Sequence, residues 1–172
     1  MIFNKVRKVS KKMLLAVFSD SHGNTEAMIS AIEAHRPDVV LFLGDGAADA
    51  EKLQTRFPRI PFHIVCGNCD LPRRGREESL LLEFEGLSVF MAHGHRYGVK
   101  MNLDSFANAA YFSGANIGLY GHTHRAFYKA YGALQIMNPG SVGDGMFPTF
   151  GLIEIENGIA TCKILDIKKE NK

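Results

Sequence analysis

Short apolar runs alternate with segments of helical character in the first half of the chain. The runs Met13–Phe18, Val39–Leu43 and Phe62–Cys66 are strand candidates, while residues 24–35 and 47–57 are helix candidates. A strand covered by helices on both faces of a parallel sheet reads as such a run, because neither of its faces meets water. This order predicts a β-α-β-α-β unit with parallel strands and right-handed crossovers.

Hairpin patterns dominate the second half of the chain. A helix at residues 103–113 and a strand at residues 117–120 interrupt them. The paired strand candidates are residues 80–84 with 87–92, 126–131 with 134–137, and 150–156 with 159–165. Asn157-Gly158 is the strongest turn signal among them. These strands are more than one sheet commonly holds, so we expect an α/β fold of two packed sheets with helices outside.

Length and charge favour one domain with short polar ends. The 172 residues fit a single domain, and we expect a basic, disordered extension at residues 1–12, one domain at 13–167 and a polar tail at 168–172. The formal net charge of +2 arises in the extension, without which 15 basic residues face 18 acidic ones. The charge therefore does not indicate a nucleic-acid partner.

The cysteines and the absence of long apolar stretches predict a cytoplasmic protein. No apolar run approaches the ~20 residues that span a bilayer, so no membrane partner is expected. Cys66, Cys69 and Cys162 form an odd set without a secretory signal, which favours free thiols in a reducing compartment. A redox pair or a zinc knuckle at Cys66 and Cys69 is disfavoured, because a turn follows and no second pair exists. Edge strands leave a homodimer or a higher oligomer open.

Polar clusters follow five of the strand candidates directly. They are Asp20-Ser21-His22, Gly44-Asp45, Gly67-Asn68-Cys69-Asp70, His93-Gly94-His95 and Gly121-His122-Thr123-His124. Each alone is better explained as a turn, a helix cap or a hydrogen-bonded residue. Together they predict a metal site, because ligands in α/β sheets gather beyond the carboxyl ends of the strands and these side chains suit divalent metals. Their number suggests two ions, whereas His35 and His63 are expected to be structural.

The order D-x-H, G-D, G-N-x-D, H-G-H and G-H-T-H resembles that of the calcineurin-like metallophosphoesterases, over residues 13 to about 165. With Asn138-Pro139-Gly140-Ser141 following, the chain is most similar to their small single-domain phosphodiesterase branch. That branch includes the small scaffold subunit of the retromer complex. The resemblance implies a four-layer α/β/β/α sandwich of two mixed β-sheets flanked by helices.

The resemblance also implies a ligand set and a reaction. One ion would be held by Asp20, His22, Asp45 and His124, and the second by the bridging Asp45 with Asn68, His93 and His122. Two ions ~3.5–4 Å apart activate a bridging hydroxide, which attacks the phosphorus of a small phosphodiester. Oxygen and imidazole ligands without a thiolate favour Mn²⁺, with Zn²⁺, Fe and Ni²⁺ as alternatives. The catalytic residues implied are Asn68, Asp45, His93, Cys69 and His95.

Cys69 departs from the family pattern. Related proteins have a histidine there, usually held by the next acid and credited with protonating the leaving oxygen. Cysteine is a weaker acid–base group, so phosphodiesters with acidic leaving groups are the expected substrates, and His95 either replaces the histidine or supports the metal ligands. A non-catalytic metal-binding scaffold and a phosphomonoesterase are the alternative functions.

Two further segments have open interpretations. Ser141 or nearby backbone amides either meet the phosphate or form a plain turn. Arg73, Arg74 and Arg76 either attract the second substituent of the diester or belong to a solvated loop, since Glu77 and Glu78 follow at once.

Overall fold

The computed structural model describes residues 12–71, 75–143 and 147–167. The expected extension, apart from Lys12, and the expected tail at 168–172 lie outside these residues. Within them, no helix is long and apolar enough to cross a membrane. The three cysteines are free thiols, as expected.

The first sheet is mixed and five-stranded, with the order β10-β9-β1-β2-β3. Strands β1 (Met13–Phe18), β2 (Val39–Phe42) and β3 (Phe62–Ile64) run parallel. This confirms the β-α-β-α-β unit. The hairpin of β9 (Thr149–Glu156) and β10 (Ile159–Asp166) returns to this sheet, where β9 pairs antiparallel with β1.

The second sheet is also mixed and five-stranded, with the order β4-β5-β6-β8-β7. Its hairpin of β4 (Ser79–Phe84) and β5 (Leu87–Ala92) turns at Glu85-Gly86, as predicted. Strand β6 (Ile117–Leu119) lies parallel to β5 on one side and to β8 (Leu134–Asn138) on the other. Strand β7 (Phe127–Tyr131) closes the edge antiparallel to β8.

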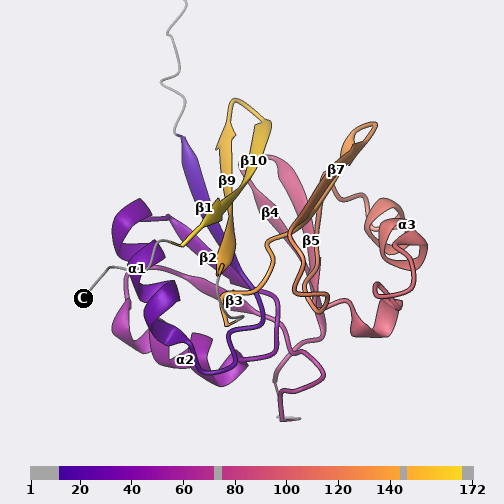
Figure 1. Ribbon diagram of the computed structural model, residues 1–172. Coiled ribbons are helices and arrows are strands. Elements are labelled where there is room, and N and C mark those ends of the chain that lie inside the picture. The colour runs from indigo at the N-terminus through magenta and orange to yellow at the C-terminus, as the bar shows by residue number, and fades with distance from the viewer. Residues whose placement is uncertain (1–11, 72–74, 144–146, 168–172) are drawn as a thin grey trace, which may run out of the picture.

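Helices cover the outer faces of both sheets (Figure 1). Helices α1 (Thr25–His35) and α2 (Ala47–Arg56) pack against the first sheet, and α3 (Asp104–Phe112) packs against the second. A short 3₁₀ helix, η1 (His95–Tyr97), follows β5. The architecture is therefore the expected four-layer α/β/β/α sandwich.

The layers are joined by three apolar cores. The largest lies between the sheets, where Leu15, Leu41, Met91 and Ile117 are fully buried. The other two lie under α1 and α2 and under α3. Helix α1 begins and ends as its sequence predicts. The Asn24 side chain accepts a hydrogen bond from the Ala27 N–H, and Arg36 takes a left-handed conformation that stops the helix.

Candidate metal centre

Five loops meet at one edge of the sandwich, because the strands that they follow all point there. The loops after β1, β2 and β3 bring Asp20, Asp45 and Asn68 from the first sheet. The loops after β5 and β6 bring His93 and His122 from the second sheet. The structure thus brings together every residue that the sequence nominated as a metal ligand.

Asp20, His22 and His124 form one group of possible ligand atoms, all within 4.8 Å of one another. The Nε2 atom of His124 lies 3.2 Å from Asp20 Oδ1 and 3.4 Å from His22 Nε2. Two imidazole nitrogens that face each other cannot both carry a proton without repulsion. A cation between them satisfies both lone pairs, so this geometry fits a metal ion.

Asp45, His93 and His122 form a second group with the same close spacing. His93 Nε2 lies 3.3 Å from Asp45 Oδ2 and 3.2 Å from Asn68 Oδ1. The same Nε2 atom is 3.9 Å from Asp20 Oδ1, which belongs to the first group. The two groups are therefore neighbours, and their ligand atoms point into one shared space.

Asp20 offers an independent test of whether a cation fits. Its Oδ2 atom accepts hydrogen bonds from Ser19 Oγ at 2.5 Å and from the His122 N–H at 3.1 Å. Its Oδ1 atom is buried and has no hydrogen-bond partner within the described part of the chain. A buried carboxylate oxygen that accepts no hydrogen bond costs stability, and here its nearest polar neighbour is His124 Nε2 at 3.2 Å. A metal ion would supply the missing interaction, so the donor set fits the metal that the sequence predicts.

A hydrogen bond from its second ring nitrogen fixes the orientation of the His93 ring. Its Nδ1–H donates to the Leu43 carbonyl oxygen at 2.8 Å, which leaves Nε2 with a lone pair directed at the ligand groups. Histidine ligands in proteins are commonly oriented by such a bond from the other ring nitrogen. His93 is fully buried, so neighbouring groups enclose the ring as well.

The Asp70 carboxylate joins two of the site loops. Its Oδ1 atom accepts from the N–H groups of Gly46 and Ala47, and its Oδ2 atom accepts from those of Asp45 and Gly67, at 2.8–2.9 Å. These four bonds tie the loop of Asp45 to the loop of Asn68. The acid next to Cys69 is therefore occupied by backbone amides.

The Asp49 carboxylate holds a third loop of the site, the one that follows β1. From the first turn of α2 it accepts hydrogen bonds from Ser21 Oγ and the Gly23 N–H, each at 2.8 Å. This fixes the loop that carries Asp20 and His22. This positioning role of Asp49 could not be predicted from the sequence, because an acid in the first helical turn is common for electrostatic reasons alone.

Two glycines allow the loops to approach this closely. A Cβ atom at Gly67 would lie 2.0 Å from Asp45 Oδ1, and one at Gly121 would lie 1.9 Å from Ser19 Oγ. Neither position has room for a side chain. The ligand loops thus interlock through backbone contacts that only glycine permits.

Five of the candidate ligand residues have an unusual backbone conformation. Asp20, His22, Asp45, His122 and His124 have φ values between 44° and 67°. They are five of the eight non-glycine residues with positive φ in the described chain. The left-handed conformation costs roughly 1–2 kcal/mol for a residue with a side chain, less for Asp than for His. Such strain concentrates at functional sites, where the surrounding structure enforces it.

The pKa values of the two carboxylates at the site, Asp20 and Asp45, are shifted in opposite directions. Burial raises the pKa of Asp20, although Ser19 and the nearby histidines oppose this. Burial acts in the same direction on Asp45, but hydrogen bonds from His93 and the Cys69 N–H outweigh it and hold the pKa of Asp45 well below its ordinary value.

The pKa values of the two histidines of the second group, the buried His93 and the half-buried His122, are shifted in opposite directions. Burial opposes charge on His93, yet Asp45 and Asp20 outweigh it and raise the pKa of His93. Burial, together with the charges of His93 and Lys100, lowers the pKa of His122 to about 4. Without an ion, positive charge therefore gathers on His93, between two carboxylates where a cation would also be stabilised.

Cys69 and His95 lie beside the ligands. Cys69 is exposed, and its thiol receives a contact from Asn68 Nδ2 at 3.3 Å. Its closeness to Asp45 is the main cause that raises the pKa of the thiol. The His95 ring centre lies 5.4 Å from that of His93 and 6.1 Å from that of His122. Burial and the charge on His93 lower the pKa of His95.

The Ser141 side chain supports a loop of the site and is not exposed to a substrate. This residue is buried, and its hydroxyl donates to the Asp20 carbonyl oxygen at 2.8 Å. Asn138 donates to the Gly121 carbonyl and to Thr123 Oγ1, at 2.9 and 3.0 Å. These two side chains thus support the loops that carry Asp20 and His122, and a contact between the backbone amides of this segment and a phosphate stays a prediction.

The arginine-rich segment also differs from expectation. Arg73 and Arg74 lie outside the described residues. The guanidinium of Arg76 is largely buried and donates twice to Glu51 Oε1, at 2.8 and 3.0 Å. The solvated-loop interpretation is therefore wrong for Arg76. As expected, His35 and His63 lie away from the centre and pack against Phe150 and Phe84.

Comparison with known proteins gives the class to which this fold and site belong. The family model for the calcineurin-like phosphoesterase superfamily domain matches residues 13–158. The probable metallophosphoesterase YsnB of Bacillus subtilis is 31% identical over 161 residues, which cover 90% of this chain and 91% of that protein. The chain belongs to the calcineurin-like phosphoesterase superfamily.

Solved structures agree on the fold. A conserved uncharacterized protein and predicted phosphoesterase of Streptococcus pneumoniae superposes with a TM-score of 0.75 at 25% identity, covering 91% of this chain and 90% of the other. Vps29 of Entamoeba histolytica, solved in complex with zinc, superposes with a TM-score of 0.71 at 21% identity, covering 91% of this chain and all of the other. The described fold is thus shared by both proteins.

Proposed function

We propose that this protein is a metal-dependent phosphodiesterase that uses two divalent ions. The observation that carries the proposal is the pair of adjacent ligand groups, which converge on one space at the edge of the sandwich. Membership of the calcineurin-like phosphoesterase superfamily supports it. Mn²⁺ is the metal that we propose, with Zn²⁺, Fe and Ni²⁺ as alternatives, because no thiolate belongs to the ligand set.

The ligand assignment follows the two groups. Asp20, His22 and His124 would hold one ion and Asn68, His93 and His122 the other, with Asp45 between them. When bound, such a pair neutralises charge on the phosphoryl oxygens and activates a water molecule for attack on phosphorus. The chain itself contributes the fixed placement of these atoms, through the His93–Leu43 bond and the amides held by Asp70. Such fixed placement is what phosphoryl transfer requires of a protein.

The preference for diesters with acidic leaving groups rests on Cys69 and His95. The raised pKa of the Cys69 thiol keeps it neutral, and the lowered pKa of His95 keeps this imidazole unprotonated near pH 7. Neither group therefore supplies a strong acid for an alkoxide that leaves. A nitrophenolate or a comparably acidic alcohol needs no such help.

Two alternatives share the same fold. A non-catalytic metal-binding scaffold is favoured by the missing histidine at Cys69, and a phosphomonoesterase would use the same ions on a substrate with one ester bond. We prefer the phosphodiesterase because every expected ligand position is filled and assembled. The three free thiols also support a reducing compartment, and we propose the cytoplasm.

Hydrolysis of bis(p-nitrophenyl) phosphate and p-nitrophenyl phosphate tests the proposal. The protein is first stripped with EDTA, then assayed with Mn²⁺, Zn²⁺, Fe²⁺ or Ni²⁺, while bound metal is counted by elemental analysis. Asp45→Asn should abolish activity, whereas Asp38→Asn, which alters a carboxylate that binds the Leu14 N–H, should not.

The outcomes separate the three functions. Metal-dependent hydrolysis with a preference for the diester supports the phosphodiesterase. Two bound ions without hydrolysis of either ester identify the scaffold, and a preference for the monoester identifies the phosphomonoesterase.

A further inference from the structure

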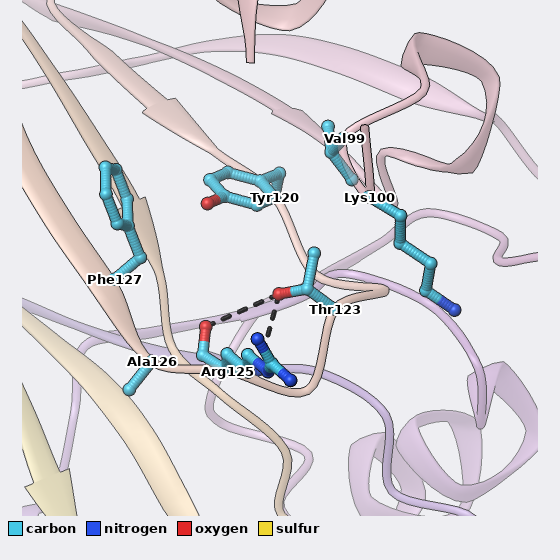
Figure 2. A pocket seen from close by; sticks show the side chains of 7 residues that line it. All are labelled: Val99, Lys100, Tyr120, Thr123, Arg125, Ala126 and Phe127. Carbon is cyan, nitrogen blue, oxygen red and sulfur yellow. Dashed lines mark hydrogen bonds between the residues drawn. The ribbon is translucent and has the colours of Figure 1, made fainter. Parts of the chain in front are cut away.

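A pocket of about 540 Å³ adjoins the metal centre on the side of the second sheet. Figure 2 shows it between Val99 and Lys100 on one side and Phe127 on the other, with Tyr120 and Thr123 between them. The Val99–Lys100 segment follows η1, in the loop that begins at His93. Thr123 stands between His122 and His124. The volume of the pocket falls in the range of small-molecule sites. Two of the loops that line the pocket also carry proposed metal ligands.

The walls of this pocket combine apolar side chains with the polar side chains of Thr123, Lys100 and Arg125. The Tyr120 ring is almost fully buried and packs against Phe106 and Phe127, at 5.2 and 6.3 Å between ring centres. Val99 is buried as well, against Gly94 of the His93 loop. These packed side chains form the floor of the pocket, and the partly exposed Phe127 ring is the aromatic surface that a ligand can contact.

Two cations flank this surface. Lys100 and Arg125 are exposed, and they come from separate loops (Figure 2). Neither makes an ion pair within 4.0 Å of a carboxylate in the described part of the chain, unlike Arg56, Arg76 and Arg96, which all do. Two exposed cations at one pocket form a surface that favours an anionic ligand.

The pocket is coupled rigidly to the metal ligands. The Arg125 N–H donates to Thr123 Oγ1 at 3.3 Å, and Asn138 Nδ2 donates to the same oxygen at 3.0 Å. These bonds hold the turn that carries His122 and His124. A group bound in the pocket therefore has a fixed position relative to a phosphoryl group at the centre.

We propose that this pocket binds the second substituent of the phosphodiester, and that Lys100 and Arg125 select a substituent with a negative charge of its own. A nucleoside that carries a further phosphate has this chemistry, with a flat base that can stack on the Phe127 ring and a phosphate for the two cations. This inference rests on the proposed phosphodiesterase function and names the substrate class for it.

Two matched substrates test the selection. Thymidine 5′-(p-nitrophenyl phosphate) and its 3′-phosphorylated form share the scissile bond and the leaving group, and differ by one phosphate. We expect kcat/KM to be roughly tenfold higher for the 3′-phosphorylated form, since two solvent-exposed charge contacts give about this factor. Lys100→Ala and Arg125→Ala should each reduce the preference roughly threefold, and the double variant should abolish it.

Lys129→Ala is the matched control, because it removes one positive charge from β7 outside the pocket. Lys129 lies over the Tyr131 ring, 4.8 Å from its centre, and this variant should keep the preference. An equal loss in all three single variants, or equal kcat/KM for both substrates in the parent protein, would overturn the inference.

A binding measurement separates this inference from the proposed function. Thymidine 3′,5′-bisphosphate and thymidine 5′-monophosphate are titrated calorimetrically into the EDTA-treated protein. Tighter binding of the bisphosphate that is lost in the Lys100→Ala/Arg125→Ala variant supports the pocket, even when no ester is hydrolysed. Equal binding of both nucleotides refutes it, even when bis(p-nitrophenyl) phosphate is a good substrate.

Discussion

Replacing Asp70 by Asn tests how the two central loops are held together. The carboxylate accepts hydrogen bonds from four backbone N–H groups, two at each oxygen. A side chain with only one acceptor oxygen cannot replace all four bonds. An amide at this position keeps one oxygen and places an NH₂ group against two N–H donors. The substitution therefore removes two hydrogen bonds to a charged acceptor.

The size of the effect follows from these two bonds. Each hydrogen bond to a charged group contributes about 1.5–3 kcal/mol, and the partial exposure of Asp70 favours the lower figure. We expect Asp70→Asn to lower the free energy of unfolding by about 3 kcal/mol. For a chain of this length, this corresponds to a fall in Tm of roughly 6–12 °C.

The measurement is guanidinium denaturation of the EDTA-treated protein, followed by calorimetric titration with Mn²⁺. Asp38→Asn is the control, because Asp38 accepts a single backbone N–H, from Leu14, and can keep that bond as an amide. Metal affinity should fall about 10- to 100-fold in Asp70→Asn, as for other groups that orient ligands. Equal stability of the two variants would refute the role assigned to Asp70.

Three shorter predictions address other parts of the site and fold. Gly67→Ala should weaken Mn²⁺ binding at least tenfold in calorimetry, because the new methyl group displaces the Asp45 carboxylate; unchanged affinity would contradict the close approach. Burial lowers the pKa of His63, so the unfolded chain gains a proton there first as the pH falls below about 6.5. The stability of His63→Leu relative to the parent protein should thus rise between pH 7 and pH 5, and a constant difference in denaturation midpoints would count against this. Cys69→His should raise turnover more on alkyl phosphodiesters than on nitrophenyl ones, and equal gains on both would argue against a missing proton donor.

The local elements of the fold could be predicted because their signals lie within a few neighbouring residues. The apolar run at β2 and the turn at Asn157-Gly158 each act over less than one element. The assignment of strands to sheets has no such signal. The β9–β10 hairpin follows the second sheet in the chain yet pairs with β1 of the first, because packing between distant residues decides it.

The candidate site divides in the same way. The ligand residues could be nominated because their side-chain chemistry and their place after strands are visible in the sequence. The residues that hold them could not, because Asp49, Asp70 and Ser141 act through backbone groups of loops far away in the chain. Lys100 and Arg125 also escaped notice, since single basic residues in loops are common on any protein surface.

The left-handed backbone of the five proposed ligand residues has a consequence for how this chain would change under selection. Glycine at any of these positions would relieve strain while removing a ligand. Laboratory evolution for thermal stability alone, in a medium with chelator, should therefore erode the centre, and the same selection with Mn²⁺ present should preserve it. The metal would then be the agent that keeps these residues in the sequence.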